Sequence, residues 1–242
     1  MDDKRGECME LILTKKPKNV TIIEGFPGFG LVGTITTEFL TNHLECEPIG
    51  QIIVKDVAPI VAIHTEKLVK PISLFYNKKY NLLIIHSISP GTKAEWKIGE
   101  AVSQIIKQTQ AKQIISLEGV MNQTQPNENV FFYSNNASVS KKLESLKLLK
   151  MKEGIVVGVT AALLTNTSSN FLAFFAETHT DMPDSRAAAR MIKALDVYLG
   201  LKVDYKPLIK QAELFEAKIK NIVEKGNAAA VVQKEKQISY VG

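Results

Sequence analysis

The chain has 242 residues, 45% of which are apolar, and a formal net charge of +5. This composition predicts a packed core without a disulfide framework or structural zinc, since the two cysteines, Cys8 and Cys46, lack metal-ligand spacing. A charged N-terminus, apolar runs well short of the roughly 20 residues of a membrane span and no basic cluster argue against membrane and nucleic-acid partners, so we expect a cytoplasmic protein.

The N-terminal half alternates short apolar runs with turns. Val20–Glu24 predicts a buried strand, which a glycine-rich loop joins to a helix over Leu31–Leu44. An antiparallel meander is expected next, continuing into the strand Leu82–Ser87, with its earlier strands at Gln51–Val54, Pro59–Thr65 and Ile72–Tyr76. A helix over Lys93–Gln110 and a strand over Gln113–Leu117 follow.

The second half continues the alternation of strands and helices. Val130–Tyr133 predicts a strand and Ser138–Leu149 a helix, whereas Gly154–Leu164 fits either a buried strand or a helix. Phe171–Glu177 predicts another strand. The helix after it has a regular apolar face and starts in the segment DMPD, with Asp181 as its expected cap, Pro183 in its first turn and Gly200 as its end.

These elements predict an α/β fold with three layers and a mixed sheet over residues 1–203. An amphipathic helix is expected over 204–226, because its apolar residues follow the rhythm of a helix–helix seam: Leu208, Ala212, Phe215, Ile219 and Ile222. Residues 227–242 lack a periodic apolar face and are expected to form a flexible tail.

The glycine-rich loop has two interpretations. Gly28, Gly30 and Gly33 form the pattern G-x-G-x-x-G, which can cradle a pyrophosphate at a helix N-terminus while an acid such as Asp56 holds the ribose. However, Pro27 removes a backbone donor, and a meander follows in place of a second βα unit. We favour the alternative, that these glycines make a tight turn and let the helix pack closely on the sheet, so no cofactor is expected.

Acidic and histidine side chains near strand ends are the other candidates for chemistry. Glu177, His179 and Asp181 alternate, so an extended backbone would point them the same way, as in a metal or acid–base site, although Asp181 is also explained as a cap. Glu118, at the end of another predicted strand, is the best remaining acid. Histidines on strands are more typical of a hydrogen-bonded core or edge, and two are expected there, His64 and His86.

Two segments together carry a recognisable signature. The first, GFPGFGLVGTITTEFL, contains Gly25, Pro27, Gly28, Gly30 and Gly33. The second, ETHTDMPDSRAAARMIKALDVYLGLKVDYKPLIKQAE, contains Glu177, Thr178, Pro183 and Asp184. In order and spacing, over roughly residues 18–225, the chain resembles the proteasome assembly chaperone family in its archaeal form.

The resemblance implies a nucleoside-phosphorylase-like α/β/α core that acts by binding and not by catalysis. It also implies homo-oligomers and association with α subunits of the proteasome 20S core. Some archaeal members end in hydrophobic-Tyr-X, a tail that enters pockets between α subunits. This chain ends in Tyr240, Val241 and Gly242, which places the Tyr one position earlier than in that pattern.

Two functions are therefore under consideration. The leading hypothesis is a non-enzymatic proteasome assembly chaperone or adaptor, with Tyr240–Gly242 as an additional contact. The alternative is a small-molecule enzyme of nucleosidase-like fold that uses Glu118, Glu177 or Asp181 beside the glycine loop. The alternative requires these carboxyl groups to converge in a pocket.

Overall fold

A computed structural model describes residues 9–57, 59–64, 66–89, 91–121, 128–166, 169–179, 182–210 and 212. Its centre is a mixed sheet of nine strands. In spatial order these are β1 (Met9–Leu13), β3 (Glu47–Val54), β6 (Ile72–Asn77), β7 (Leu82–Ser87), β2 (Thr21–Gly25), β8 (Gln113–Met121), β11 (Phe171–Thr178), β9 (Val130–Ser134) and β10 (Leu149–Lys150). The α/β class expected from the sequence is confirmed.

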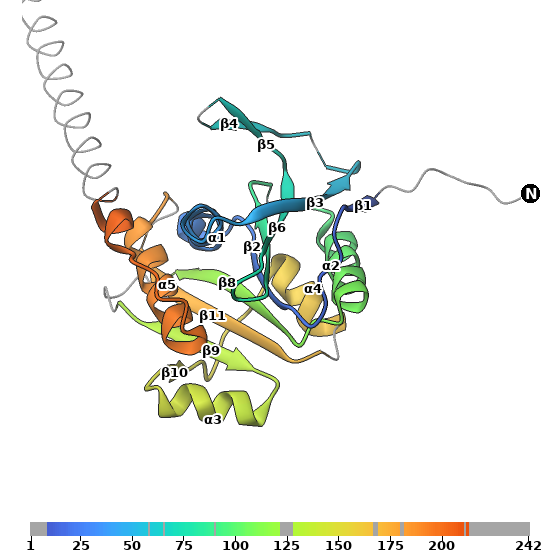
Figure 1. Cartoon of the computed structure of the whole chain (residues 1–242). Coiled ribbons are helices and arrows are strands. Elements are labelled where there is room, and N and C mark those ends of the chain that lie inside the picture. Colours follow the sequence, from blue (N-terminus) through green and yellow to red (C-terminus); the bar gives the residue numbers. More distant parts are fainter. Residues whose placement is uncertain are drawn as a thin grey trace, which may run out of the picture.

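The middle of the sheet is parallel and one edge is antiparallel. Strand β2 pairs in parallel with both β7 and β8, and β8 pairs in parallel with β11. On the other side of β7, strands β6 and β3 continue the sheet antiparallel, as predicted, and β1, which was not predicted, adds an edge strand to β3. The predicted strand Pro59–Thr65 is wrong as part of this meander, because its described strand β4 pairs only with β5. A separate hairpin of β4 (Ala62–His64) and β5 (Lys67–Val69) projects away from the sheet (Figure 1).

Helices cover both faces of the sheet, and each face has its own apolar cluster. The helices are α1 (Val32–His43), α2 (Glu95–Thr109), α3 (Ala137–Ser145), α4 (Gly158–Asn166) and α5 (Ser185–Leu199). Helices α1 and α5 contact each other and pack on the face that carries Ile23 and Leu117. Helices α2 and α4 lie side by side on the opposite face, which carries Ile22 and Ile114 (Figure 1). Alternate residues of β2 and β8 thus enter different clusters, as the pleat requires.

Several predicted boundaries differ from the structure. The ambiguous run Gly154–Leu164 becomes helical only from Gly158, and α3 ends at Ser145 because Lys147 takes a left-handed conformation (φ 62) before the chain enters β10. Strand β8 extends beyond the predicted Leu117, so that Glu118 lies within the strand. Strand β10 pairs with β9, and the extended end of β8 pairs with β11. Local periodicity does not encode either pairing.

The start of α5 also corrects the predicted cap. Asp184 is the N-cap, and its side chain accepts a hydrogen bond from the backbone N–H of Ala187. Pro183 therefore precedes the cap and is not in the first helical turn, and Asp181, which lies outside the described residues, is too far upstream to cap Ser185. Gly200 ends the helix in the left-handed conformation, as predicted.

The described start of the predicted C-terminal helix packs on this same domain. Residues 206–210 and 212 are helical, and Leu208 and Ala212 are buried, with Leu208 in the cluster beneath α1 and α5. The first part of the predicted helix–helix seam is thus used within the chain. The remaining seam residues and the predicted tail lie outside the described residues.

Candidate functional site

Both signature segments lie at the carboxyl ends of the parallel strands. The glycine loop follows β2, Glu118 lies toward the end of the adjacent β8, and Thr178 is the last residue of β11. In open α/β sheets, ligands bind at this end of the strands, where loops and helix N-termini converge. This edge of the sheet is therefore the first place to look for function.

The glycine loop is held by close backbone contacts. A Cβ added at Gly25 would lie 2.3 Å from the carbonyl oxygen of Gly33, and one at Gly33 would lie 2.4 Å from the carbonyl oxygen of Leu117. Gly30 (φ 62) and Leu31 (φ 48) are both left-handed. The glycines therefore let a turn and α1 pack tightly on β2 and β8, which supports the fold interpretation over a phosphate cradle.

Other features that a dinucleotide site requires have structural roles in this chain. Strand β3, which follows α1 directly, pairs antiparallel with its neighbours, so the chain does not pass from α1 into a second parallel strand as a dinucleotide fold does. Asp56, the candidate ribose acid, forms an ion pair with Lys97 of α2. Pro27 is partly buried beside the loop, and Gly28 is exposed.

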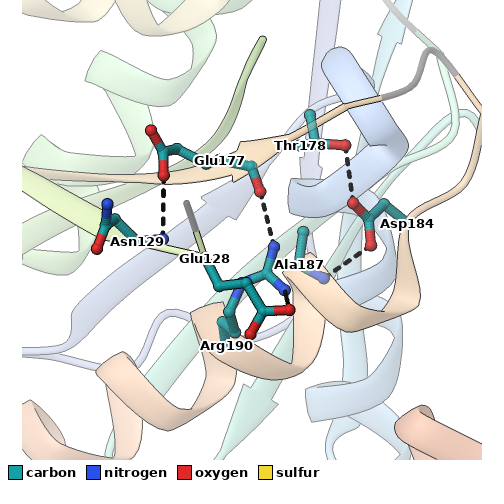
Figure 2. A network of polar contacts seen from close by, with 7 residues as sticks. All are labelled: Glu128, Asn129, Glu177, Thr178, Asp184, Ala187 and Arg190. Atoms are coloured by element: carbon teal, nitrogen blue, oxygen red, sulfur yellow. Dashed lines mark hydrogen bonds and ion pairs between the residues drawn. The ribbon is translucent and has the colours of Figure 1, made fainter. Parts of the chain in front are cut away.

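The second signature forms a polar network between β11 and α5 (Figure 2). Asp184 caps α5 through Ala187 and accepts a second hydrogen bond from the hydroxyl of Thr178, at 2.8 Å. One carboxyl oxygen of Glu177 accepts from the backbone N–H of Asn129, at 3.1 Å. The Glu177 carbonyl accepts from the guanidinium of Arg190, at 2.8 Å. Glu177 and Asp184 thus have contacts that fix a turn and a helix start.

The two signatures meet at Gly30. The backbone N–H of Asp184 donates to the Gly30 carbonyl at 2.8 Å, and a Cβ at Gly30 would lie 2.7 Å from Oγ1 of Thr178. The two motifs are therefore far apart in the sequence but in direct contact in the structure. Their shared role among the described residues is to lock the glycine loop against the start of α5.

A buried acid pair lies on the other face of the sheet. Glu24 of β2 is fully buried, and its Oε1 accepts hydrogen bonds from Ser116 of β8 and from Thr160 of α4. The hydroxyl oxygen of Thr160 also lies 2.5 Å from Oε1 of Glu118, so this hydroxyl group can donate to Glu118 in place of Glu24. Two hydroxyl groups therefore connect two carboxyl groups, while the second oxygen of Glu24 is buried without a hydrogen bond.

Burial changes the acidity of both carboxyl groups. Desolvation, with a smaller contribution from Glu118, raises the pKa of Glu24 well above its ordinary value. Desolvation also raises the pKa of Glu118 to about 7, although the hydrogen bond from Thr160 opposes this change. Burial therefore favours the protonated form of both carboxyl groups.

A cavity of about 680 Å³ opens beside Glu118. The residues that line it come from the glycine loop, β8, β9, β11, α4 and the segment before α4, and they include Phe29, Tyr133, Met151, Val156, Leu164 and Phe175. This combination of an apolar wall with a carboxyl group of shifted pKa is typical of a binding site. Among the predicted acids in the described ranges, Glu118 lines this cavity.

The other predicted site residues do not join this cluster. His86 is buried and bonded to Thr37 at 3.0 Å, and burial lowers its pKa to about 4, so it behaves as the expected core histidine. His179 is exposed just after β11, and His64 ends β4 on the projecting hairpin. Within the described ranges, no group of three His, Cys, Asp or Glu residues is arranged to hold a metal ion.

Comparison with known proteins decides the family. The PAC2 family matches residues 22–223. The chain belongs to the PAC2 family. The resemblance expected from the two signature segments is thereby confirmed.

Archaeal proteins are among the relatives of this PAC2 protein. An uncharacterized protein of Methanocaldococcus jannaschii is 28% identical over 210 residues, covering 86% of this chain and 87% of its own length. The crystal structure of Pyrococcus furiosus PbaA, described as an archaeal homolog of proteasome-assembly chaperone, matches with a TM-score of 0.83 and 28% identity, covering 95% of this chain and 98% of PbaA. Pyrococcus furiosus PbaB, an archaeal proteasome activator, shares the fold, with a TM-score of 0.75, 17% identity and coverage of 88% and 98%.

Sequence reasoning missed three members of the acid cluster in this PAC2 protein. Glu24 was expected only as the end of a buried strand, and Ser116 and Thr160 were not singled out. The available signal was a glutamate inside an apolar strand, since a buried carboxyl group requires partners.

No helix in the described part of the chain is long and apolar enough to cross a membrane.

Proposed function

We propose that this PAC2 protein is a non-enzymatic proteasome assembly chaperone or adaptor that binds α subunits of the proteasome core. The observation that carries the proposal is the likeness to PbaA along nearly the whole chain, including both signature segments. A binding role fits a structure in which Glu177 and Asp184 are engaged in caps and turns. We further propose a cytoplasmic homo-oligomer.

Exposed apolar side chains support a protein partner. On the projecting hairpin, Ile63 and Leu68 face each other in register and are 79% and 61% exposed. Val61, just before the hairpin, is 58% exposed. Apolar side chains gathered on one projecting element are typical of an interaction surface. We assign this hairpin to contacts with a proteasome subunit or a second copy.

The C-terminal tail is proposed as an additional contact. Tyr240, Val241 and Gly242 lie outside the described residues, so the proposal rests on their sequence. A tyrosine followed by two small apolar residues suits a pocket between subunits, in a register shifted by one residue.

The enzyme alternative has one observation in its favour, the position of Glu118 beside the cavity. Of its other candidates, Glu177 accepts a bond from Asn129, and Asp181 lies outside the described residues. A small-molecule enzyme of nucleosidase-like fold therefore rests on Glu118, with Glu24 as its neighbour. We place it second to the binding role.

The experiment that tests the binding role is a pull-down of archaeal α subunits and of assembled core particles. The bait is used as the full chain, as a chain lacking Tyr240–Gly242, and as the double variant I63S/L68S. V197S is the matched control, because Val197 is 45% exposed on α5, away from the hairpin segment. If the truncated chain captures less α subunit, the result supports docking of the tail. If I63S/L68S captures less, the result supports contact through the hairpin. If no form captures α subunits or core particles, the proposal is contradicted.

A further inference from the structure

The polar end of the cavity is formed by Glu118. One oxygen of this carboxyl group is bonded to Thr160, and the other faces the glycine loop, since a Cβ at Gly28 would lie 3.2 Å from Oε2. Gly28 has no side chain to cover that oxygen, and Gly28 is itself exposed. The carboxyl group of Glu118 therefore borders the cavity at the loop position that has no side chain, Gly28.

No cation balances the acid pair among the described residues. The hydrogen bonds to Glu24 and Glu118 come from the neutral hydroxyl groups of Ser116 and Thr160. None of the ion pairs found in the described ranges includes either acid. The fully buried Oε2 of Glu24 lacks a partner as well. A charged carboxylate shielded from water is ordinarily paired, so Glu118 in its ionised form has an unfilled requirement for positive charge.

The other titratable side chains that line the cavity are at its rim. Lys152 and Glu153 lie in the segment before α4, and both are exposed, with opposite charges. Tyr133 of β9 is 41% exposed on the opposite wall. From β2, Glu24 faces Glu118 through Thr160. The cavity thus offers one partly buried carboxyl group, Glu118, beside apolar and aromatic walls.

We propose that this cavity binds an organic cation, an ammonium or amidinium group carried on an apolar body, with Glu118 as its counter-ion. The charged head donates to the free oxygen of Glu118, and the apolar body packs against Phe29, Met151 and Phe175. Aromatic walls also favour a cation through their π faces. The head group is that of a free amine or of a lysine side chain from another chain, and the two sources are separated below.

The site couples cation binding to proton release. The pKa of Glu118 lies at about 7 because burial disfavours its charged form. A bound cation favours that charged form, so binding below this pH releases a proton. Affinity should therefore rise as the pH increases toward 7 and level off above it. A neutral ligand in the same cavity would not show this dependence.

The test is an NMR titration of the full chain with phenethylamine, with phenethyl alcohol as the neutral probe of nearly equal shape. A blocked dipeptide of phenylalanine and lysine represents a lysine side chain. The proposal predicts saturable shifts at the amides of Phe29, Gly119 and Phe175 with at least one cationic probe. Stronger binding of the dipeptide than of phenethylamine identifies a partner's lysine as the source, and the reverse order identifies a free amine.

Two variants give the test its specificity. E118Q should weaken binding of the cation by at least about tenfold, because a buried charge pair is lost. E153Q is the matched control, since it removes an exposed carboxylate of the same rim, and it should leave binding unchanged. If E118Q does not fold, the pH dependence of the unaltered protein provides the same test. The proposal would be overturned if phenethyl alcohol bound as tightly as phenethylamine, or if neither cation gave a saturable shift. It would also be overturned if E118Q kept the affinity for the cation, or if only E153Q lost it. None of these results depends on proteasome binding.

Discussion

The backbone N–H of Asp184 donates a hydrogen bond to the carbonyl oxygen of Gly30, with 2.8 Å between the two atoms. This bond joins the glycine loop after β2 to the start of α5, and Thr178 lies against both. The two sequence segments that define this PAC2 protein are therefore one structural unit. Their shared function in the described structure is to fix the shape of the loop that also walls the cavity.

The Asp184 side chain is expected to stabilise this unit as a helix cap. D184A removes the bonds to Ala187 and Thr178 and should lower the free energy of unfolding by about 1–2 kcal/mol. D184N is the control, because asparagine also caps a helix N-terminus, and its loss should be clearly smaller. Urea denaturation of both variants measures the difference, and equal losses would contradict the capping role.

Gly30 should tolerate a side chain less well than another left-handed glycine. G30A forces a methyl group toward Thr178 at a position where φ is 62, whereas Gly158 (φ 76) has open space around it. G158A should cost only the left-handed strain, roughly 1 kcal/mol. G30A should cost that strain plus the steric clash. A thermal melt in which G30A is as stable as G158A would show that the loop relaxes without penalty.

Glu118 should give the stability of the protein a distinctive pH dependence. Its pKa is raised from an ordinary 4.5 to about 7, so the native state holds a proton that the unfolded state releases over this interval. Stability from this group is present below the lower value and is lost as the pH rises through about 7. E118Q should remove the part of the slope that comes from Glu118 and leave the part that comes from Glu24. Denaturation curves at several pH values compare the two chains, and identical slopes would contradict the assignment.

The last three residues should contribute nothing to folding. The predicted tail shows no apolar periodicity, so removing Tyr240–Gly242 should leave the melting temperature unchanged. A clear decrease on truncation would show that these residues pack on the folded domain. Without that decrease, any loss of proteasome binding by the truncated chain can be attributed to a lost contact.

Local sequence patterns predict much of this fold. The apolar face of α5 and its stop at Gly200 follow from helical spacing, and Val20–Glu24 anticipates β2 within one residue. The hairpin strand β5 and the short β10 were missed, because each is too brief for a periodic signal and depends on its partner strand. Strand β1, which pairs with β3 at the sheet edge, was missed for a similar reason.

The candidate site was less accessible to sequence reasoning. Glu118 could be singled out from its place at a strand end, but Glu24, Ser116 and Thr160 come together only through the pairing of β2 with β8 and the packing of α4 on them. The enzyme hypothesis also groups Glu177 and Asp181 with Glu118. That grouping fails for Glu177, whose carboxyl group accepts a bond from the start of the β9 segment.

Sedimentation velocity of the full chain mixed with isolated archaeal α subunits tests the central claim most directly. The proposed role predicts a boundary that moves faster than either protein alone and contains both chains. V197S should behave identically, since Val197 lies outside the proposed contacts. Two independent boundaries at micromolar concentrations, with each protein folded, would contradict the assignment of this PAC2 protein as a proteasome-binding chaperone or adaptor.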